Sequence, residues 1–403
     1  MNSSPWLSIV GIGEDGLAGV PAAGRALIDG AEIVLGGQRH LEMLPGDHPA
    51  EQWTWKSPLK DTVRDLHDVA GRPVCVLATG DPMSYGIGVT LGREFGHQAL
   101  TVLPAVGAFS LAAARTGWPL QDVDCLTLHG RPLDLIAPYL RPGARLLVLS
   151  EDGATPAQVA RYLEDRGFGD SQLSVLCHLG GPKEERVDGL ARDWGGRQTA
   201  DLNTIAVTCV AGAGASWYGR TGLPDAAFLN DGQLTKREVR AVTLASLAPQ
   251  PGELLWDVGG GCGSISIEWM RAGGRAIAIE NHAERADLIA RNAARLGVPQ
   301  LKVVRGDAPA ALDGLPAPQA VFIGGGITAD LLAETCWQAL AAPGRLVANT
   351  VTLSGEEKLH RLWHEWGGEM SRIDVSRLLP VGGQHGWKPF RPVTHYQVWK
   401  KDG

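Results

Sequence analysis

The sequence predicts an α/β fold in two consecutive domains, one over residues 1–222 and one over residues 223–403. Strand-length apolar runs alternate with amphipathic helical segments along the chain, which is typical of α/β proteins with largely parallel sheets. Glycine-bearing turns follow many of these runs, and 53 of the 403 residues are glycine. The stretch 211–225, rich in glycine and alanine, interrupts the alternation and places the domain boundary near residue 222.

In the first half, apolar and β-branched runs predict six strands. They cover residues 7–11, 32–36, 74–78, 144–150, 173–179 and 203–211. Apolar spacing of three and four residues predicts helices between them, each with one face packed on a sheet. These helices cover residues 21–30, 57–70, 86–96, 107–116 and 155–166.

The second half begins with a predicted helix over residues 234–249 and a strand over 253–260. A further helix starts at Cys262, and another covers 283–297, with Gly297 in the position that ends many helices. The remaining strands are expected at 275–280, 301–307, 319–326, 345–351, 373–379 and 394–400. Seven strands with helices between them are therefore expected here.

Composition and charge exclude several classes of protein. With 44% hydrophobic and 20% charged residues, the chain can bury full cores, which argues against disorder. A formal charge of −7 and a pI of about 5.9 argue against a nucleic-acid partner, but leave room for a local basic pocket. The sequence has no apolar run of about 18 residues and no signal-type start, so we expect a cytoplasmic protein without a membrane span.

The cysteines are scattered and form no CxxC pair. They are Cys75, Cys125, Cys177, Cys209, Cys262 and Cys336. Most lie in apolar runs, so we expect reduced, buried thiols rather than disulfides or a zinc site. No metal site is predicted.

The strongest motif of the second half is the glycine loop DVGGGCGS, which follows a strand and opens a helix. Its glycines can adopt positive φ and let a ligand approach the backbone, while the helix start offers free amide donors. Glu280 ends the next strand, where an acid can bond ribose hydroxyls, and Asp307 follows the third strand. This arrangement predicts a nucleoside-cofactor site, although its spacing differs from the GxGxxG of dinucleotide enzymes.

The segments LTKREVRA, LLWDVGGGCGSISIEWMR, AIAIE, FIGGG and PGRLVANTVTL together resemble the class I S-adenosylmethionine (SAM) methyltransferases. Among these they are most similar to the precorrin decarboxylating methyltransferase domain of cobalamin biosynthesis. The resemblance implies a Rossmann-like seven-stranded domain and a set of SAM-binding residues. That set is Thr235, Asp257, Gly259, Gly260, Gly261, Cys262, Gly263, Glu280, Asp307 and Ala308. The family loop usually reads GAGSG or GAGTG, so Cys262 replaces a hydroxyl residue and removes one hydrogen bond.

The first half carries four glycine-bearing turns at the ends of predicted strands, where α/β sheets bind ligands. Their order, GxG, GDP, PAVGAFS and HGR, together with VLGGQRHLEML, resembles the class III tetrapyrrole methylases. The resemblance implies a two-lobed domain that binds SAM through Val10, Gly11, Gly80, Asp81, Pro82, Ala105 and Val106. The family's first loop often reads GxGPG, whereas Glu14 and Asp15 follow Gly13 here. Asp81 can equally brace its own turn.

Both resemblances in one chain imply two C-methylations of an anionic precorrin, with one SAM site per domain. The first domain is expected to act at C5, and the second at C15 with loss of CO₂ from the ring C acetate. Because the substrate carries many carboxylates, cationic side chains should line the clefts. The candidates are Arg39, Arg131, Lys183, Arg186, Lys236, Arg237, Lys388 and Arg391. A homo-oligomer is expected from both families.

Three alternatives stay open at this point. The chain could act on another tetrapyrrole such as a cobalt-precorrin, or carry one inactive domain. The glycine loops alone also fit a dinucleotide-dependent oxidoreductase, and a tetrapyrrole carrier would bind without turnover. No catalytic residue is predicted because the meso carbons of a reduced tetrapyrrole resemble enamines and need no strong base. His385 is a candidate proton donor, and Trp217, Trp269 and Trp387 fit either ring stacking or core packing.

Overall fold

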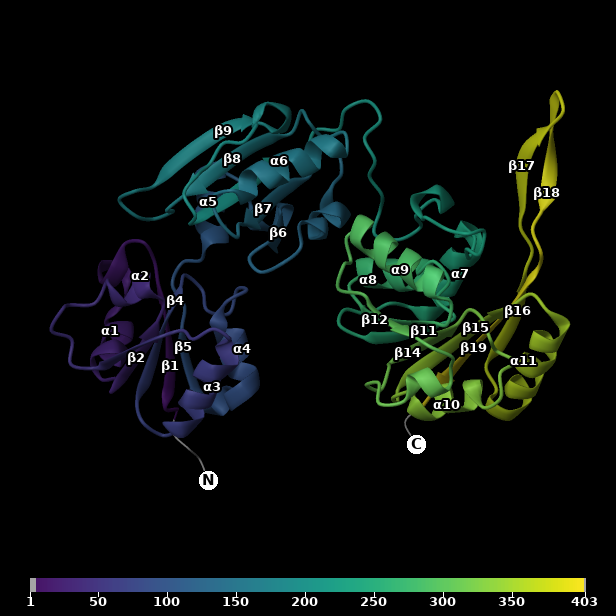
Figure 1. The fold of residues 1–403 in the computed structure, drawn as a ribbon, viewed down its shortest axis with the longest axis horizontal. Helices are drawn as coiled ribbons and strands as arrows, with labels where there is room; N and C mark the ends of the chain where they lie inside the picture. Colours follow the sequence, from purple (N-terminus) through teal and green to yellow (C-terminus); the bar gives the residue numbers. More distant parts are fainter. Residues whose placement is uncertain (1–4, 402–403) are drawn as a thin grey trace. The chain divides into compact units, whose positions relative to one another are not determined.

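A computed structural model describes residues 5–401, which fall into two compact units (Figure 1). Unit 1 consists of Met1–Leu133 and Arg141–Ser216, and unit 2 consists of Asp134–Leu140 and Trp217–Gly403. Each unit has its own sheets and its own buried clusters.

The first sheet of unit 1 is entirely parallel, with strand order β3-β2-β4-β1-β5. Its strands are β1 (Leu7–Ile12), β2 (Ile33–Gly36), β3 (Glu51–Thr54), β4 (Val74–Thr79) and β5 (Leu100–Leu103). The helices among them are α1 (Ala22–Asp29), α2 (Gln38–Leu41), α3 (Leu59–Asp68) and α4 (Ile87–Phe95). Ile9 and Val10 belong to different buried clusters, so alternate residues of β1 pack on opposite faces of the sheet.

The second sheet of unit 1 corrects the expectation of largely parallel sheets. Its order is β6-β7-β10-β8-β9, and β6 and β7 form its one parallel pair among the described residues. The strands are β6 (Asp124–Thr127), β7 (Arg145–Leu149), β8 (Gln172–Cys177), β9 (Glu185–Leu190) and β10 (Asn203–Thr208). The helices are α5 (Ala108–Thr116) and α6 (Thr155–Asp165). A loop of seven residues joins β8 to β9, which is too short for a parallel crossover.

Unit 2 contains the expected seven-stranded sheet, with order β13-β12-β11-β14-β15-β19-β16. The first five strands run parallel, and β19 is antiparallel to both of its neighbours. The strands are β11 (Leu254–Val258), β12 (Arg275–Glu280), β13 (Lys302–Arg305), β14 (Ala320–Ile323), β15 (Gly344–Thr350), β16 (Glu369–Ile373) and β19 (Val393–Lys400). The helices are α7 (Arg237–Leu247), α8 (Ser264–Arg271), α9 (Ala283–Arg295), α10 (Leu332–Ala339) and α11 (Leu353–Trp366). Gly297 has φ +84° just beyond α9, in the predicted position.

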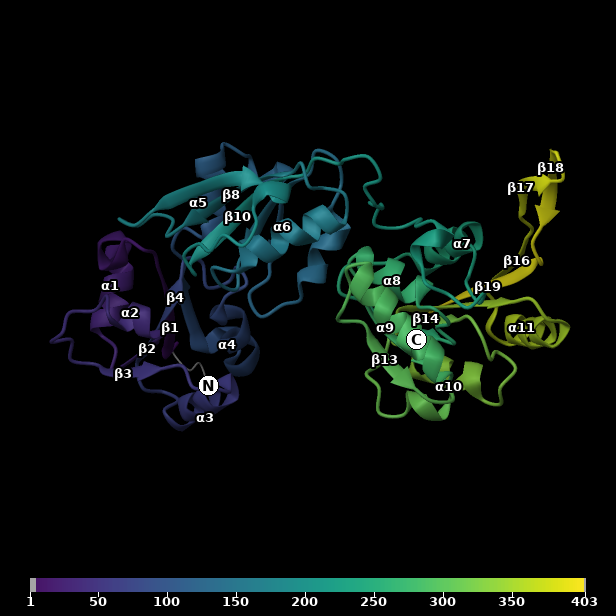
Figure 2. The ribbon, with the colours of Figure 1, turned by 45° about the horizontal axis from the view of Figure 1, so that its top comes forward.

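The predicted strand over residues 373–379 is confirmed only in part, because these residues do not form one strand of the seven-stranded sheet. Those residues include the end of β16 and the start of β17 (Ser376–Val381), which pairs with β18 (Gln384–Pro389) in a separate two-stranded ribbon. Figure 2 shows this ribbon projecting from the sheet of unit 2. Leu378 and Leu379 are exposed on it, so their apolar character does not mark a core strand.

Candidate functional site

A cavity of about 830 Å³ lies in unit 2, at the carboxyl ends of the parallel strands. Most of the residues predicted to bind SAM in this half line it together. They are Thr235, Asp257, Gly259, Gly260, Gly261, Cys262, Glu280, Asp307 and Ala308. Gly263 does not line the cavity. The side chains that sequence reasoning missed include His282, Arg285 and the run 349–352.

The glycine loop depends on a left-handed backbone conformation that other residues rarely adopt. Gly259 and Gly261 have φ values of +72° and +59°. A Cβ atom on Gly259 would lie 2.8 Å from the backbone nitrogen of Gly325, so two glycine segments pack directly against each other. A Cβ atom on Gly263 would lie 2.9 Å from Ile289, which shows that this glycine serves helix packing. The loop therefore leaves its backbone open to a ligand.

Glu280 and Asp307 occupy fixed positions beside this loop. The Glu280 carboxylate accepts hydrogen bonds from the backbone nitrogens of Gly261 at 2.9 Å and His282 at 3.0 Å. Asp307 accepts a hydrogen bond from the Asn281 amide at 2.8 Å. Each carboxylate retains lone pairs for a ligand, because a carboxylate can accept about four hydrogen bonds.

Asp257 is the fully buried acid of the site. Its Oδ2 accepts hydrogen bonds from the backbone nitrogen and the hydroxyl of Ser266. Burial raises the pKa of Asp257 to about 6, the Ser266 hydrogen bonds oppose this, and the charge of Glu280 adds to it. Near neutral pH the cavity wall therefore holds two neighbouring carboxylates, an environment that favours a cationic ligand.

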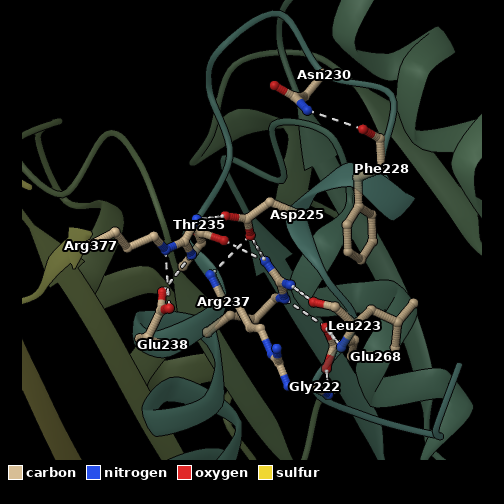
Figure 3. Close-up of polar contacts among 11 residues, drawn as sticks. Gly222, Leu223, Asp225, Phe228, Asn230, Thr235, Arg237, Glu238, Glu268 and Arg377 are labelled. Carbon is tan, nitrogen blue, oxygen red and sulfur yellow. Dashed lines mark hydrogen bonds and ion pairs between the residues drawn. The ribbon is translucent and has the colours of Figure 1, made fainter. Parts of the chain in front are cut away.

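A buried ion pair fixes the segment that carries Thr235 (Figure 3). The Arg240 guanidinium donates to Glu268 Oε1 at 2.6 Å and to the Thr235 carbonyl at 2.5 Å. It also donates to the Leu223 carbonyl, while Glu268 accepts from the backbone nitrogens of Gly222 and Leu223. Arg240 thus ties residues 222–235 to helix α8. Sequence reasoning missed this pair because each member resembles an ordinary helical surface charge.

Two of the predicted cations of this half, Lys236 and Arg391, line the cavity. Arg237 does not line it. Lys388, predicted to bind substrate, is exposed on the ribbon opposite Arg377 and lies outside the cavity lining, as does His385. Lys388 lies outside the cavity because it belongs to a two-stranded ribbon and not to a turn at the edge of the seven-stranded sheet.

The predicted loops of unit 1 converge at the ends of three adjacent strands. The Gly80 nitrogen donates to the Ile12 carbonyl at 3.0 Å, and the Ala105 nitrogen donates to the Gly80 carbonyl at 3.1 Å. A Cβ atom on Gly11 would overlap the backbone of both Gly80 and Ala105. The sequence motifs GxG, GDP and PAVG are therefore in direct contact.

The other predicted SAM-binding residues of unit 1 differ in exposure. The Asp81 carboxylate accepts from the Met83 nitrogen at 2.9 Å, so it braces its own turn. Pro82 is buried next to it. The Val10 side chain is buried in the core, which leaves its backbone alone for a ligand, whereas Val106 is exposed at its loop.

A charged cluster lies where Glu14 replaces the proline that the resemblance led us to expect. Glu14 forms an ion pair with Arg39 and a hydrogen bond of 2.8 Å with His178 Nδ1. Arg39 also contacts Thr79 Oγ1 at 3.0 Å and His40 Nε2 at 3.1 Å. Burial and the nearby Arg39 charge lower the pKa of His40 to about 4. The charge of Arg39 is therefore already compensated within the protein.

The remaining predicted cations of unit 1 are dispersed. Arg131 lines a second cavity of about 210 Å³ and lies over the Tyr85 ring at 5.5 Å. Arg186 pairs with Asp188 at 2.9 Å, and Lys183 is exposed in the turn before β9. Among the described residues, no hydrogen bond or ion pair joins Arg39 to any of these three.

Residues 5–401 contain no group of three or more His, Cys, Asp or Glu side chains that could hold a metal ion. Within the same residues, no helix is long and apolar enough to cross a membrane. All six cysteines are free, and five of them are buried. Trp269 is buried in the core of unit 2, whereas Trp217 and Trp387 are exposed.

Comparison with known proteins gives two family matches. Residues 7–194 match the tetrapyrrole (corrin/porphyrin) methylases, and residues 226–400 match the precorrin methyltransferase domain. A precorrin-6Y C(5,15)-methyltransferase (decarboxylating) from a Sinorhizobium species is 49% identical over 401 residues, which cover 99% of this chain and 97% of that protein. The protein of the same name from Mycobacterium tuberculosis strain H37Rv is 42% identical over 399 residues, 98% and 99% of the two chains. The crystal structure of the C-terminal domain of this methyltransferase from Rhodobacter capsulatus is 47% identical, covers 45% of this chain and all of that one, and gives a TM-score of 0.44.

Proposed function

Because this chain belongs to the precorrin-6Y C(5,15)-methyltransferase (decarboxylating) family, we propose that it methylates a late precorrin at C5 and C15 with SAM. The same enzyme removes the ring C acetate carboxyl as CO₂. The observation that carries the proposal is the near-complete alignment with a relative of that name at 49% identity. The proposal excludes an oxidoreductase and a carrier as the main activity.

The two activities are divided between residues 1–222 and 223–403. The first part carries C5 methylation, and the second carries C15 methylation with decarboxylation. Support comes from the two family matches, which lie in separate parts of the chain, and from a separate glycine-loop cluster in each unit. One SAM site per part follows from this division.

The cavity of unit 2 fits SAM in size and in the chemistry of its lining. A volume of about 830 Å³ lies within the range of small-molecule pockets. Glu280 and Asp307 offer acceptors for the ribose and adenine, and the glycine loop leaves its backbone open to the rest of the molecule. SAM supplies an electrophilic methyl group, and these residues orient it and exclude water.

Mass spectrometry of the products tests the proposal directly. The full chain is incubated with SAM and a metal-free or cobalt-containing late precorrin, and the product is expected to gain two methyl groups and lose one CO₂. Glu280→Ala should remove C15 methylation, and Asp81→Ala should weaken C5 methylation. No mass change with either substrate, or NADH binding without SAM binding, would refute the proposal.

We also place the enzyme in a reducing compartment such as the cytoplasm and expect a homo-oligomer. Six free cysteines, five of them buried, support the first point. Size-exclusion chromatography with light scattering tests the second, and a monomer at micromolar concentration would contradict it.

A further inference from the structure

Asn349 is a polar side chain on the wall of the unit 2 cavity. It lies near the carboxyl end of β15, is half buried, and lines the cavity together with residues 350–352. Its direct partner in the antiparallel register is His395 of β19. His395 does not line the cavity and is 3% exposed.

A chain of hydrogen bonds fixes both ends of the Asn349 amide. Oδ1 lies 2.7 Å from His395 Nδ1, and Nδ2 donates to Thr243 Oγ1 at 2.8 Å. The Thr243 hydroxyl donates in turn to the Val239 carbonyl at 2.8 Å. On the other side, His395 Nε2 lies 2.9 Å from Ser246 Oγ. All of these groups belong to unit 2.

The direction of each hydrogen in this chain follows from donor counting. A backbone carbonyl only accepts, so the Thr243 hydroxyl gives its proton to Val239 and must accept from Asn349. The amide nitrogen of Asn349 therefore faces Thr243, and its oxygen faces His395. His395 then carries its proton on Nδ1, which leaves Nε2 to accept from Ser246. Burial lowers the pKa of His395, which favours this neutral form.

Asn349 retains one amide N–H beyond these contacts. Among the described residues, no other hydrogen bond to its side chain is formed. Because Asn349 lines the cavity, we infer that a ligand there is the partner of this N–H. A group so strictly oriented is suited to a site that must hold its ligand in one geometry.

The sheet order places Asn349 on the side of the cavity away from the nucleoside acids. The glycine loop follows β11, near the middle of the parallel strands. Strands β12 and β13 lie on one side of β11, where Glu280 ends β12 and Asp307 follows β13. Strands β14 and β15 lie on the other side, and β15 carries Asn349. With about 4.8 Å between neighbouring strands, β13 and β15 each lie about 10 Å from β11. A cofactor with its nucleoside at Glu280 and Asp307 leaves the β15 side for the methyl acceptor.

We propose that Asn349 donates its free amide N–H to the acetate carboxylate that leaves as CO₂, and that His395 positions Asn349 for this contact. The inference rests on the proposed function and adds a substrate-binding residue and a positioning residue to it. Lys236 and Arg391, which also line the cavity, remain for the carboxylates that the reaction keeps.

A neutral amide suits the leaving carboxylate better than a cation. During decarboxylation the negative charge moves from the carboxylate into the ring system. An arginine or lysine on that carboxylate would stabilise the starting state more than the transition state, and so would slow the reaction. An amide N–H also holds the carboxylate in place, but it stabilises the negative charge of the starting state less than a cation does.

The step balances without an added oxidant or reductant. The bond between the acetate methylene and its carboxylate breaks, CO₂ leaves, and the electron pair enters the conjugated imine system of the ring. A proton then adds at the methylene carbon to give a methyl group. Methylation at C15 forms a C–C bond, breaks the S–CH₃ bond of SAM and releases one proton, so the two steps together exchange no net proton with solvent.

Variants at both positions test the proposal in the full chain. Asn349→Ala should lower the rate of CO₂ loss about 100-fold, because the carboxylate is then no longer held in the geometry for bond cleavage, and should leave the Kd for SAM within about twofold. Asn349→Asp keeps the size of the side chain but sets a negative charge against the carboxylate, so it should be at least as slow. Thermal unfolding of each variant checks the fold.

The positioning role of His395 has its own control. His395→Ala should slow CO₂ loss about 10-fold, and His395→Asn should restore much of it, because its amide nitrogen can replace the Nδ1 donor. Ser371→Ala changes an exposed residue that pairs with His395 from the other side of β19, and should leave the rate unchanged.

Two outcomes would overturn the inference alone: CO₂ loss at the wild-type rate in Asn349→Ala, or loss of SAM binding in that variant. If the wild-type protein neither methylates nor decarboxylates the precorrin, the proposed function itself fails, and the inference fails with it. The activity of the wild-type chain therefore separates the two cases.

Discussion

Arg240 and Glu268 form an ion pair that is closed to solvent, with the Arg240 Nε atom 2.6 Å from Glu268 Oε1 and both side chains at most 1% exposed. Each also bonds backbone groups of the segment over residues 222–235. The pair therefore connects helices α7 and α8 to the segment that carries the cavity residue Thr235.

Arg240→Ala should lower the free energy of unfolding of unit 2 by about 3–5 kcal/mol, because it leaves the Glu268 carboxylate buried without its cation. Urea unfolding of the full chain measures the change. Arg305→Ala is the matched control, since its pair with Asp287 is more than half exposed and should contribute less than about 1 kcal/mol. Equal losses in the two variants would contradict this role for the buried pair.

Gly11→Ala should remove the SAM site that we propose for unit 1. An added Cβ atom overlaps the backbone of Gly80 and Ala105, so the loops that form the site must separate. Isothermal titration of the full chain should then show one SAM site, where we expect the wild type to show two. Gly46→Ala serves as the control, because a Cβ atom there meets nothing within 4 Å. An unchanged stoichiometry in Gly11→Ala would show that SAM binds elsewhere in this unit.

Glu280→Gln should weaken SAM binding in unit 2 by at least about 10-fold. Both carboxylate oxygens accept backbone N–H groups, and a glutamine would place its own NH₂ group against one of those donors. Titration in a Gly11→Ala background isolates this site. Glu284→Gln, an exposed change on α9, is the control, and equal affinities in the two variants would oppose a role for Glu280.

Asp257 should make unit 2 less stable as the pH rises. Its pKa in the folded protein is raised from the ordinary 3.8 to about 6, so the folded state holds a proton that the unfolded state has already lost. The stabilising contribution is complete below about pH 4 and is lost as the pH passes through about 6. The Asp257→Asn variant has no such carboxyl group. Between pH 4 and pH 7 its free energy of unfolding should therefore rise relative to that of the wild type, by on the order of 3 kcal/mol. Urea unfolding without SAM at several pH values checks this, and parallel stability curves would contradict it.

The sequence predicted the part of the unit 2 site that depends on strand ends. Parallel strands bring their carboxyl ends to one edge of the sheet, so Glu280 and Asp307 could be placed beside the glycine loop from their positions after strands alone. Six of the seven strands of its sheet followed from the same alternation of strands and helices.

Features that depend on pairing between distant segments could not be predicted in this way. Asn349 and His395 face each other because β19 returns antiparallel beside β15, and no local pattern marks that register. The partners Arg240 and Glu268 are 28 residues apart on different helices. The prediction at the ribbon failed for a different reason: the sequence shows that Leu378 and Leu379 are apolar but does not show that they are exposed.

The buried cysteines can be used to measure local unfolding of each unit. Burial raises the pKa of the thiols of Cys75 and Cys209 in unit 1 to about 12, as it does for Cys336 in unit 2. A thiol reagent reacts with the thiolate and needs access to it, so each of these residues should be alkylated only when its surroundings unfold. Peptide mapping after timed alkylation would then follow the opening of the two units separately, within one unmodified chain and without any introduced label.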